Sequence, residues 1–312
     1  MAAITAALVK ELREMTGAGM MDCKKALAAT DGDMDKAVDF LREKGLAGAQ
    51  KKAGRIAAEG LSYTYLSDDA KEGVVVEVNA ETDFVAKNEK FRNFVDEVAK
   101  QAIASVNTEI EKFLEETWKL DETLTVAQKL SSMISIIGEN MHIRRFVKVT
   151  EKEGFVESYV HGGGRIGVLL DVATDVDNAE IHEMAKNICM QIAALKPLYT
   201  TRDEVDADYI AREKEILLAQ IKNDPKEGSK PEKVIEGMIN GRINKELKEI
   251  VLLDQVYVKA EDGKQTVAQY INQVAKANGA NVSLKGFVRF ETGEGLENKN
   301  ENFAEEVAKQ MM

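Results

Sequence analysis

ETDFVAKN, at residues 81–88, stands where the apolar pattern of the chain changes its period. The run VVVEV at 74–78 precedes it and predicts a buried strand, while apolar residues at helical spacing follow it. Thr82 or Asp83 can therefore cap a helix by accepting a hydrogen bond from one of its free first-turn amides. In this interpretation the stretch is an ordinary helix start, and Phe84 packs into the core.

The first 55 residues predict a separate unit of three short helices. Apolar residues recur at helical spacing up to Met15, and the sequence GAG at 17–19 then breaks the helix. A second helix is expected from about Asp22, and a third after the sequence DGD at 31–33. A linker then leads to a part of the chain that contains strands.

Residues 56–150 and 151–292 each combine strands with helices in a similar order. The expected strands lie at 61–66, 73–79 and 142–149 in the first block and at 154–161, 166–173 and 282–290 in the second, which also has a helix at 178–195. Two blocks of like order predict an α+β fold with two related halves.

Residues 203–250 interrupt the second block and differ from it in kind. They are rich in charge, and their apolar residues fall on two narrow seams on either side of a break that contains two prolines. The first seam is Val205, Tyr209, Ile216 and Ile221, and the second is Val234, Met238, Leu247 and Ile250. This pattern predicts an antiparallel helical hairpin that projects from the core.

The last residues, 293–312, predict a short helical module. Phe303, Val307 and Met311 recur at helical spacing, and acidic residues occupy the positions between them. An amphipathic helix of this kind is expected to dock on another surface.

The composition excludes several classes of protein. Apolar residues make up 44% and charged residues 31% of the chain, and no apolar stretch approaches the ~18 residues of a membrane span. A net charge of −12 argues against nucleic-acid binding through phosphate neutralisation. The N-terminus is typical of an amphipathic helix rather than a secretory signal, so a cytoplasmic protein is expected. Cys23 and Cys189 are expected to be buried, reduced and inert.

The glycine-rich stretch GGGRIG at 162–167 matches the G-x-G-x-x-G spacing of dinucleotide-binding loops. Those loops lead into a helix, whereas the apolar pattern after Arg165 continues as a strand, which favours a β-hairpin turn. The preceding His161 would suit an oxyanion loop, but the chain has no G-x-S-x-G nucleophile. No phosphate-binding loop and no histidine with a ligand-spaced neighbour is present, so the sequence predicts neither a cofactor nor a metal nor an enzyme.

Six further motifs, together with ETDFVAKN, resemble the elongation factor Ts family, whose members exchange the nucleotide of the GTPase elongation factor Tu. They occur in the order of that family and extend over nearly the whole chain. They are ITAALVKELREMTGAGMMDCKKAL (4–27), KKAGRIAAEG (51–60), IGENMHIRR (137–145), HGGGRIGVLL (161–170), LKP (195–197) and GFVRFETGEGLE (286–297).

The resemblance implies a second interpretation of ETDFVAKN, in which Thr82, Asp83, Phe84 and Val85 form an exposed wedge that enters the GTPase. It also implies that His161 presses on the phosphate side of the nucleotide site. Further contacts with elongation factor Tu are implied at Leu12, Met20, Met21, Gly162, Phe303 and Val307. Met20 and Met21 are expected in a loop between helices, with one of them acting as a hydrophobic staple as the alternative.

The family also implies a ubiquitin-associated-like fold for residues 1–55 and pairing of two copies through the hairpin. Its activity, promotion of GDP release, contains no covalent chemistry and requires neither nucleic acid nor a membrane. The alternative from another class is an adaptor or scaffold that uses the three-helix head and the hairpin. That alternative leaves ETDFVAKN unexplained.

Overall fold

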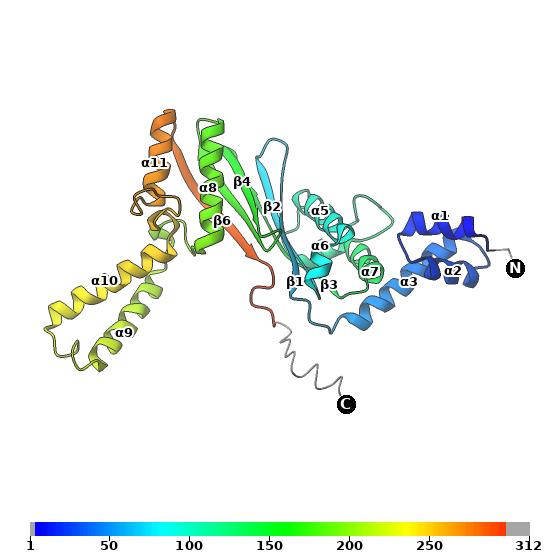
Figure 1. Ribbon diagram of the computed structural model, residues 1–312, viewed down its shortest axis with the longest axis horizontal. Coiled ribbons are helices and arrows are strands. Elements are labelled where there is room, and N and C mark those ends of the chain that lie inside the picture. Colours follow the sequence, from blue (N-terminus) through cyan, green and yellow to red (C-terminus); the bar gives the residue numbers. More distant parts are fainter. Residues whose placement is uncertain (1–3, 298–312) are drawn as a thin grey trace.

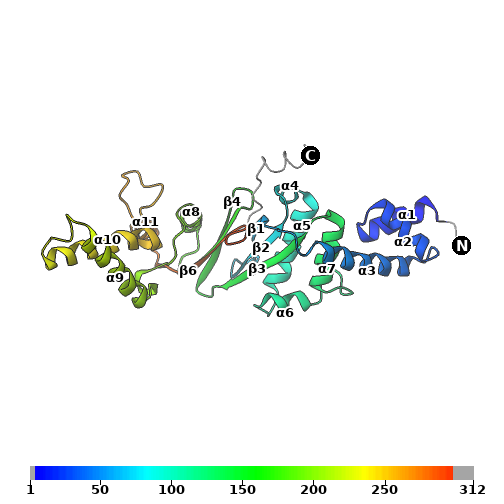
Figure 2. The same ribbon diagram turned by 90° about the horizontal axis from the view of Figure 1, so that it is seen from below.

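The computed structural model describes residues 4–297 and is elongated, as Figure 1 shows. Three helices lie at the N-terminal end, a helical hairpin lies at the opposite end, and two small sheets lie between them. The view from below in Figure 2 gives the same succession along the long axis. No described helix is long and apolar enough to cross a membrane.

The N-terminal helices are α1 (Ala6–Thr16), α2 (Met20–Ala29) and α3 (Met34–Lys52). Thr5 caps α1, and the left-handed conformation of Gly17, at φ +66°, ends it. Asp33 caps α3 by accepting a hydrogen bond from the amide of Lys36 at 3.1 Å. The three helices enclose a small core of Val9, Leu12, Cys23, Ala26, Leu27 and Ala37. The expected three helices are therefore present, although α2 begins two residues before Asp22.

The first sheet is antiparallel, with the order β1-β2-β3. Its strands are β1 (Glu59–Leu66), β2 (Glu72–Ala80) and β3 (Met141–Thr150), and its helices are α4 (Asp83–Ala86), α5 (Glu89–Ile103), α6 (Ile110–Glu115) and α7 (Val126–Ile137). Helix α3 reaches this part of the molecule and packs on α7, where the buried Gly45 lies against Ser135.

The second sheet repeats this arrangement with the order β4-β5-β6, again antiparallel. Its strands are β4 (Gly154–His161), β5 (Ile166–Thr174) and β6 (Val282–Glu291), and the helices α8 (Ala179–Leu195) and α11 (Val267–Asn278) pack beside it. Two mixed blocks with the same strand order confirm the α+β fold class.

The position of β2, with packed residues on both of its faces, explains why its sequence is an almost continuous apolar run. Val74, Val76 and Val78 face the helices of the first block, whereas Val75 faces the second sheet and packs with residues such as Leu169. A strand that is buried on both faces needs apolar residues at every position. The two sheets are therefore joined through the far side of β2.

The fully buried Glu77 lies on the same side of β2 as Val75 and links the two sheets through ion pairs and hydrogen bonds. One of its oxygens accepts hydrogen bonds from Arg144 at 2.9 Å and from the amide of Gly293 at 2.8 Å. The other accepts one from Arg145 at 2.6 Å, and the Arg145 guanidinium lies 4.1 Å from the ring centre of Phe290. The arginines belong to β3, whereas Phe290 lies near the end of β6 and Gly293 lies just beyond it. This network therefore fixes the end of β6 on the first sheet.

The hairpin consists of α9 (Ala207–Asn223) and α10 (Glu232–Ile250), as expected, but the predicted seam is wrong at two positions. Ile216 is 40% exposed and Val234 is 45% exposed, and the inward positions are those that follow them, Leu217 and Ile235. In both cases two apolar residues are adjacent, so helical spacing alone cannot decide which of them faces the other helix. Pairing of two copies through this hairpin stays a prediction.

Two carboxyl groups, Glu151 and Asp171, face each other where the first block meets β5. Burial and the adjacent Glu151 carboxylate raise the pKa of Asp171 to about 7. Burial alone would raise the pKa of Glu151 as well, but hydrogen bonds with Asp171, the Glu153 amide and Lys285 lower it to about 2. We therefore expect the pair to retain one proton up to neutral pH, with Asp171 as the favoured site.

We expect Asp171→Asn to remove a pH dependence of stability. An unfolded aspartate ionises near its ordinary pKa of about 3.9, whereas folded Asp171 keeps its proton to about pH 7. The free energy of unfolding should therefore fall as pH rises through this window, by at most about 1.4 kcal/mol per pH unit. Asparagine cannot ionise, so the variant should gain stability over the parent as pH rises from 5 to 8.

Thermal unfolding of both proteins between pH 5 and pH 8 measures this difference. The window assigned to Glu151 lies lower, between its ordinary pKa of 4.5 and about 2, and does not overlap. Asp68→Asn is the control, because Asp68 is exposed in a turn. Parallel curves for the parent and Asp171→Asn would show that Asp171 does not retain its proton.

Candidate partner-binding site

The ETDFVAKN stretch forms a corner that is capped twice. Thr82 caps the single turn of α4 by accepting from the Val85 amide at 3.4 Å, and Asn88 caps α5 by accepting from the Lys90 amide at 2.9 Å. Thr82 is itself held by Glu139, which accepts from its hydroxyl at 2.7 Å and from its amide at 3.0 Å. The predicted capped helix start is confirmed, and Glu139 is a support that sequence reasoning missed.

Phe84 does not pack into the core. Its side chain is 78% exposed, whereas the next residue, Val85, is 8% exposed and packs in the core of the first block. The core interpretation of Phe84 is therefore wrong, and so is the placement of Val85 in an exposed wedge. Consecutive residues of a helix point about 100° apart, so burial of one of them turns the other outward.

Asp83 lies beside Phe84 at the surface. Its carboxylate pairs with Lys87 at 2.7 Å, and this hydrogen bond lowers the pKa of Asp83. The Lys87 ammonium lies 5.8 Å from the ring centre of Phe84. The corner thus presents an exposed aromatic ring next to a pair of opposite charges.

The glycine-rich stretch is a β-hairpin turn between β4 and β5, as predicted, and not a loop that leads into a helix. Gly162, Gly163 and Gly164 have φ of +59°, +69° and +115°, a region that favours glycine. A Cβ on Gly164 would lie 2.2 Å from the buried Leu61 side chain, so a larger residue would force that side chain to move. His161 is exposed at the start of the turn.

One half of this turn is firmly attached to the rest of the core. The Gly164 carbonyl accepts hydrogen bonds from the Ser62 amide at 2.7 Å and from the Thr292 hydroxyl at 3.0 Å. The Arg165 carbonyl accepts from the Thr292 amide at 2.9 Å. The exposed half, from His161 to Gly163, projects beyond these attachments.

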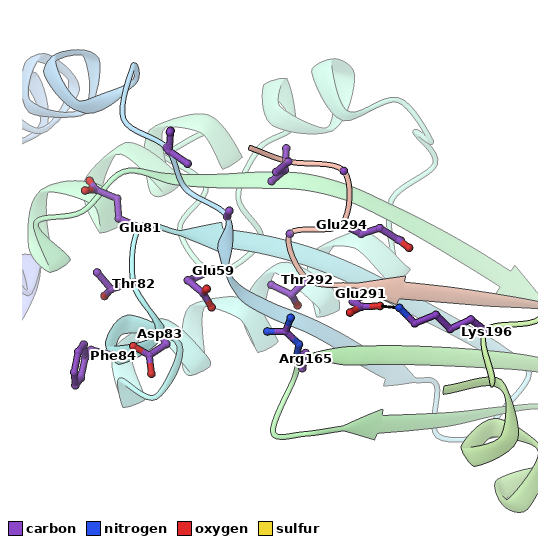
Figure 3. Close-up of a pocket in the computed structure, with 15 residues that line it drawn as sticks. Glu59, Glu81, Thr82, Asp83, Phe84, Arg165, Lys196, Glu291, Thr292 and Glu294 are labelled. Atoms are coloured by element: carbon purple, nitrogen blue, oxygen red, sulfur yellow. Dashed lines mark hydrogen bonds and ion pairs between the residues drawn. The ribbon is translucent and has the colours of Figure 1, made fainter. Parts of the chain in front are cut away.

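A cleft of about 620 Å³ lies between the first residues of α4, Arg165 and the chain at and after the end of β6. Figure 3 shows Thr82, Asp83 and Phe84 on one side of it and Arg165 on the other. The lining is mainly acidic, with Glu59, Glu81, Asp83, Glu291 and Glu294 against Arg165 and Lys196. The cleft therefore brings ETDFVAKN, Arg165 of the glycine turn and the end of β6 to one region. Of its charged residues, sequence reasoning identified Asp83 but not Arg165, Lys196 or the glutamates.

The residues expected to bind a partner near the N-terminus divide into two kinds. Met20 and Met21 lie in the first turn of α2 rather than in a loop, and they are 58% and 62% exposed. Leu12 is fully buried among the three helices, so its placement on a contact surface is wrong. Its spacing reflects the inner face of α1, whereas Met15 on the same helix is 58% exposed.

Other expectations concern groups elsewhere in the chain. Phe303 and Val307 lie outside the described residues. Cys23 and Cys189 are free and buried, and burial raises the pKa of the Cys189 thiol. Within residues 4–297 no cluster of three or more side chains could hold a metal ion.

Comparisons with known proteins agree on one family. A family profile described as Elongation factor TS matches residues 81–294. The chain is 54% identical over 308 residues to the elongation factor Ts of Clostridium botulinum (strain Eklund 17B / Type B), with 99% of each chain covered. It is 52% identical over 308 residues to that of Clostridium novyi (strain NT), again with 99% of each covered. Identity to that of Clostridium perfringens (strain 13 / Type A) is 52% over 307 residues, with 98% of each covered.

Proposed function

This chain belongs to the elongation factor Ts family, and on that premise we propose that it binds elongation factor Tu and accelerates the release of GDP. The observation that carries the proposal is the exposure of Phe84, at 78%, on a helical turn that Thr82 and Glu139 hold in place. A large aromatic side chain that is exposed on a fixed support is suited to bury itself in a partner. The corner has no comparable use in an adaptor.

The proposed mechanism is displacement without covalent chemistry. The Phe84 ring enters the GTPase, Asp83 engages polar groups beside it, and the His161 turn presses on the phosphate side of the nucleotide site. A protein that weakens GDP binding by some factor must bind the GDP form more weakly than the empty form by the same factor. GDP should therefore also displace this protein from elongation factor Tu. The proposed exchange reaction takes place in the cytoplasm.

Release of labelled GDP from elongation factor Tu tests the proposal. The measurement compares release after dilution into excess unlabelled nucleotide with and without this protein. Faster release that saturates with protein concentration is the expected result. An adaptor would bind without changing the release rate, so a stable complex with unchanged release would favour that alternative.

We expect Met20→Ser combined with Met21→Ser to weaken the complex without slowing its maximal rate. These side chains are exposed on α2, a helix whose core is separate from the core beneath α4, and they would contribute equally to the ground state and the transition state of exchange. Half-saturation should rise about tenfold with the maximal rate kept. GDP release measured over a range of protein concentrations separates the two parameters.

Val106→Ser is the control for this change, because Val106 is 93% exposed but follows α5. It should leave both parameters at their parental values. An unchanged half-saturation in the methionine variant, or an equal change in the control, would exclude a contact at Met20 and Met21.

A further inference from the structure

Arg92, in the first turn of α5, connects the two elements on either side of the cleft. Its Nη1 donates to the carbonyl of Ala86, the last residue of α4, at 3.4 Å, and to the carbonyl of Gly163 in the glycine turn at 3.3 Å. We infer that Arg92 is a positioning residue that holds the α4 corner and the glycine turn as one surface, so that Phe84 and His161 meet the partner together. The inference rests on the proposed function.

Both acceptors are carbonyl groups that their own elements leave without a partner. Helix α4 is a single turn, and the last carbonyls of a helix have no amide within it to bond. Within residues 4–297, the carbonyls of Ala86 and Gly163 accept no other hydrogen bond from outside the regular elements. Arg92 thus supplies a donor from the protein itself to two carbonyls that would otherwise bond only to water.

The two halves of the glycine turn depend on different supports. The bonds from Ser62 and Thr292 hold Gly164, which is buried. Gly163 is exposed, with φ +69° and no atoms near the position of a Cβ, so its neighbours do not confine it. Arg92 reaches it from the other block of the fold, across 71 residues of sequence. The His161 carbonyl accepts hydrogen bonds from the Gly164 and Arg165 amides. Loss of the Arg92 bond should therefore leave the turn attached at both ends but Gly162 and Gly163 free to move.

The chemistry of the side chain suits this task. Each terminal nitrogen of a guanidinium carries two N–H groups, and the group stays charged at every physiological pH. One nitrogen can therefore donate to two carbonyls at once. Methionine in its place would keep a flexible apolar stem and remove all of the donors.

The experiment compares Arg92→Met and Arg92→Lys with Lys90→Met. Lys90 is the matched control, since it is an exposed cation in the same turn of α5. We expect Arg92→Met to lower the maximal rate of GDP release about fivefold and to change half-saturation less than twofold. Arg92→Lys should recover part of this loss, and Lys90→Met should match the parent. Thermal unfolding should be the same in all four proteins.

Two further readouts separate positioning from general weakening. Amide relaxation by NMR should show greater mobility at Gly162 and Gly163 in Arg92→Met and no change at Gly164. Combining Arg92→Met with His161→Ala should slow release little more than His161→Ala alone, because residues that act through each other are not additive. A parental maximal rate in Arg92→Met, with or without added mobility, would overturn the inference.

If the parent protein does not accelerate GDP release, the proposed function fails by that result. The NMR comparison does not need elongation factor Tu, so it still decides whether Arg92 restrains the turn. Unchanged mobility of Gly162 and Gly163 in Arg92→Met would then overturn the positioning role by itself.

Discussion

Phe84→Ala is expected to slow maximal GDP release about a hundredfold while the free protein stays almost as stable as the parent. An anchor of this kind contributes roughly 2 kcal/mol or more, and a barrier increase of about 2.7 kcal/mol is a factor of about one hundred. Truncation of a core phenylalanine would instead cost about 3 to 5 kcal/mol of folding stability. The 78% exposure of the Phe84 ring excludes a cavity of that kind.

Stopped-flow GDP release from elongation factor Tu, beside thermal unfolding of the free variant, measures both quantities. Leu120→Ala is the control, since Leu120 is 70% exposed in a loop of the same block. It should affect neither rate nor stability. A strongly destabilised Phe84→Ala, or a stable one that releases GDP at the parental rate, would refute the role given to this ring.

Glu77→Gln is expected to lower the free energy of unfolding by about 3 kcal/mol or more. Removal of one partner from a buried ion pair typically costs about 3 to 5 kcal/mol, because the opposite charge stays behind unpaired. Here Arg144 and Arg145 are 25% and 33% exposed, so water can reach both cations and the lower end of that range applies. The glutamine side chain would also place an NH2 group opposite the N–H groups of Arg144, Arg145 or Gly293, so two donors would face each other without an acceptor.

Equilibrium unfolding in denaturant measures this loss. Glu72→Gln is the matched control, because Glu72 is the first residue of the same strand and is only half-buried. That control should change stability by less than about 0.5 kcal/mol. A Glu77→Gln variant as stable as its control would mean that Glu77 does not hold the end of β6.

Regular elements follow closely from the sequence because their signals are local. Strand β4 has the predicted bounds, Gly154–His161, and α8 begins one residue after Asn178, which caps it. The hairpin turn was predictable because the apolar pattern after Arg165 continues as a strand. Alternation and capping need no knowledge of the rest of the chain.

The sequence does not determine whether a given side chain faces the core or the surface, because this depends on which elements the fold packs against each face of a helix or strand. The pattern around Phe84 fits a core residue as well as a surface one, and Val85 decides the outcome by taking the inner position. Leu12 carries the same spacing whether its face meets two other helices or a partner. Arg92 offers no signal at all, because its acceptors are backbone carbonyls, one of them 71 residues away.

The shortness of α4 determines what can be separated from this protein. Four residues lie far below the ~12 to 15 that an isolated helix needs in water, so the turn depends on the rest of the fold. Val85 is buried in the core, and Glu139 accepts hydrogen bonds from Thr82. A synthetic peptide with the sequence ETDFVAKN would populate many conformations in solution. The conformational entropy lost on binding would offset most of the free energy gained by burial of the Phe84 ring. An inhibitor based on this corner must therefore reproduce the conformation of the turn, by a cyclic restraint or an added helix N-cap, and not only its amino-acid sequence.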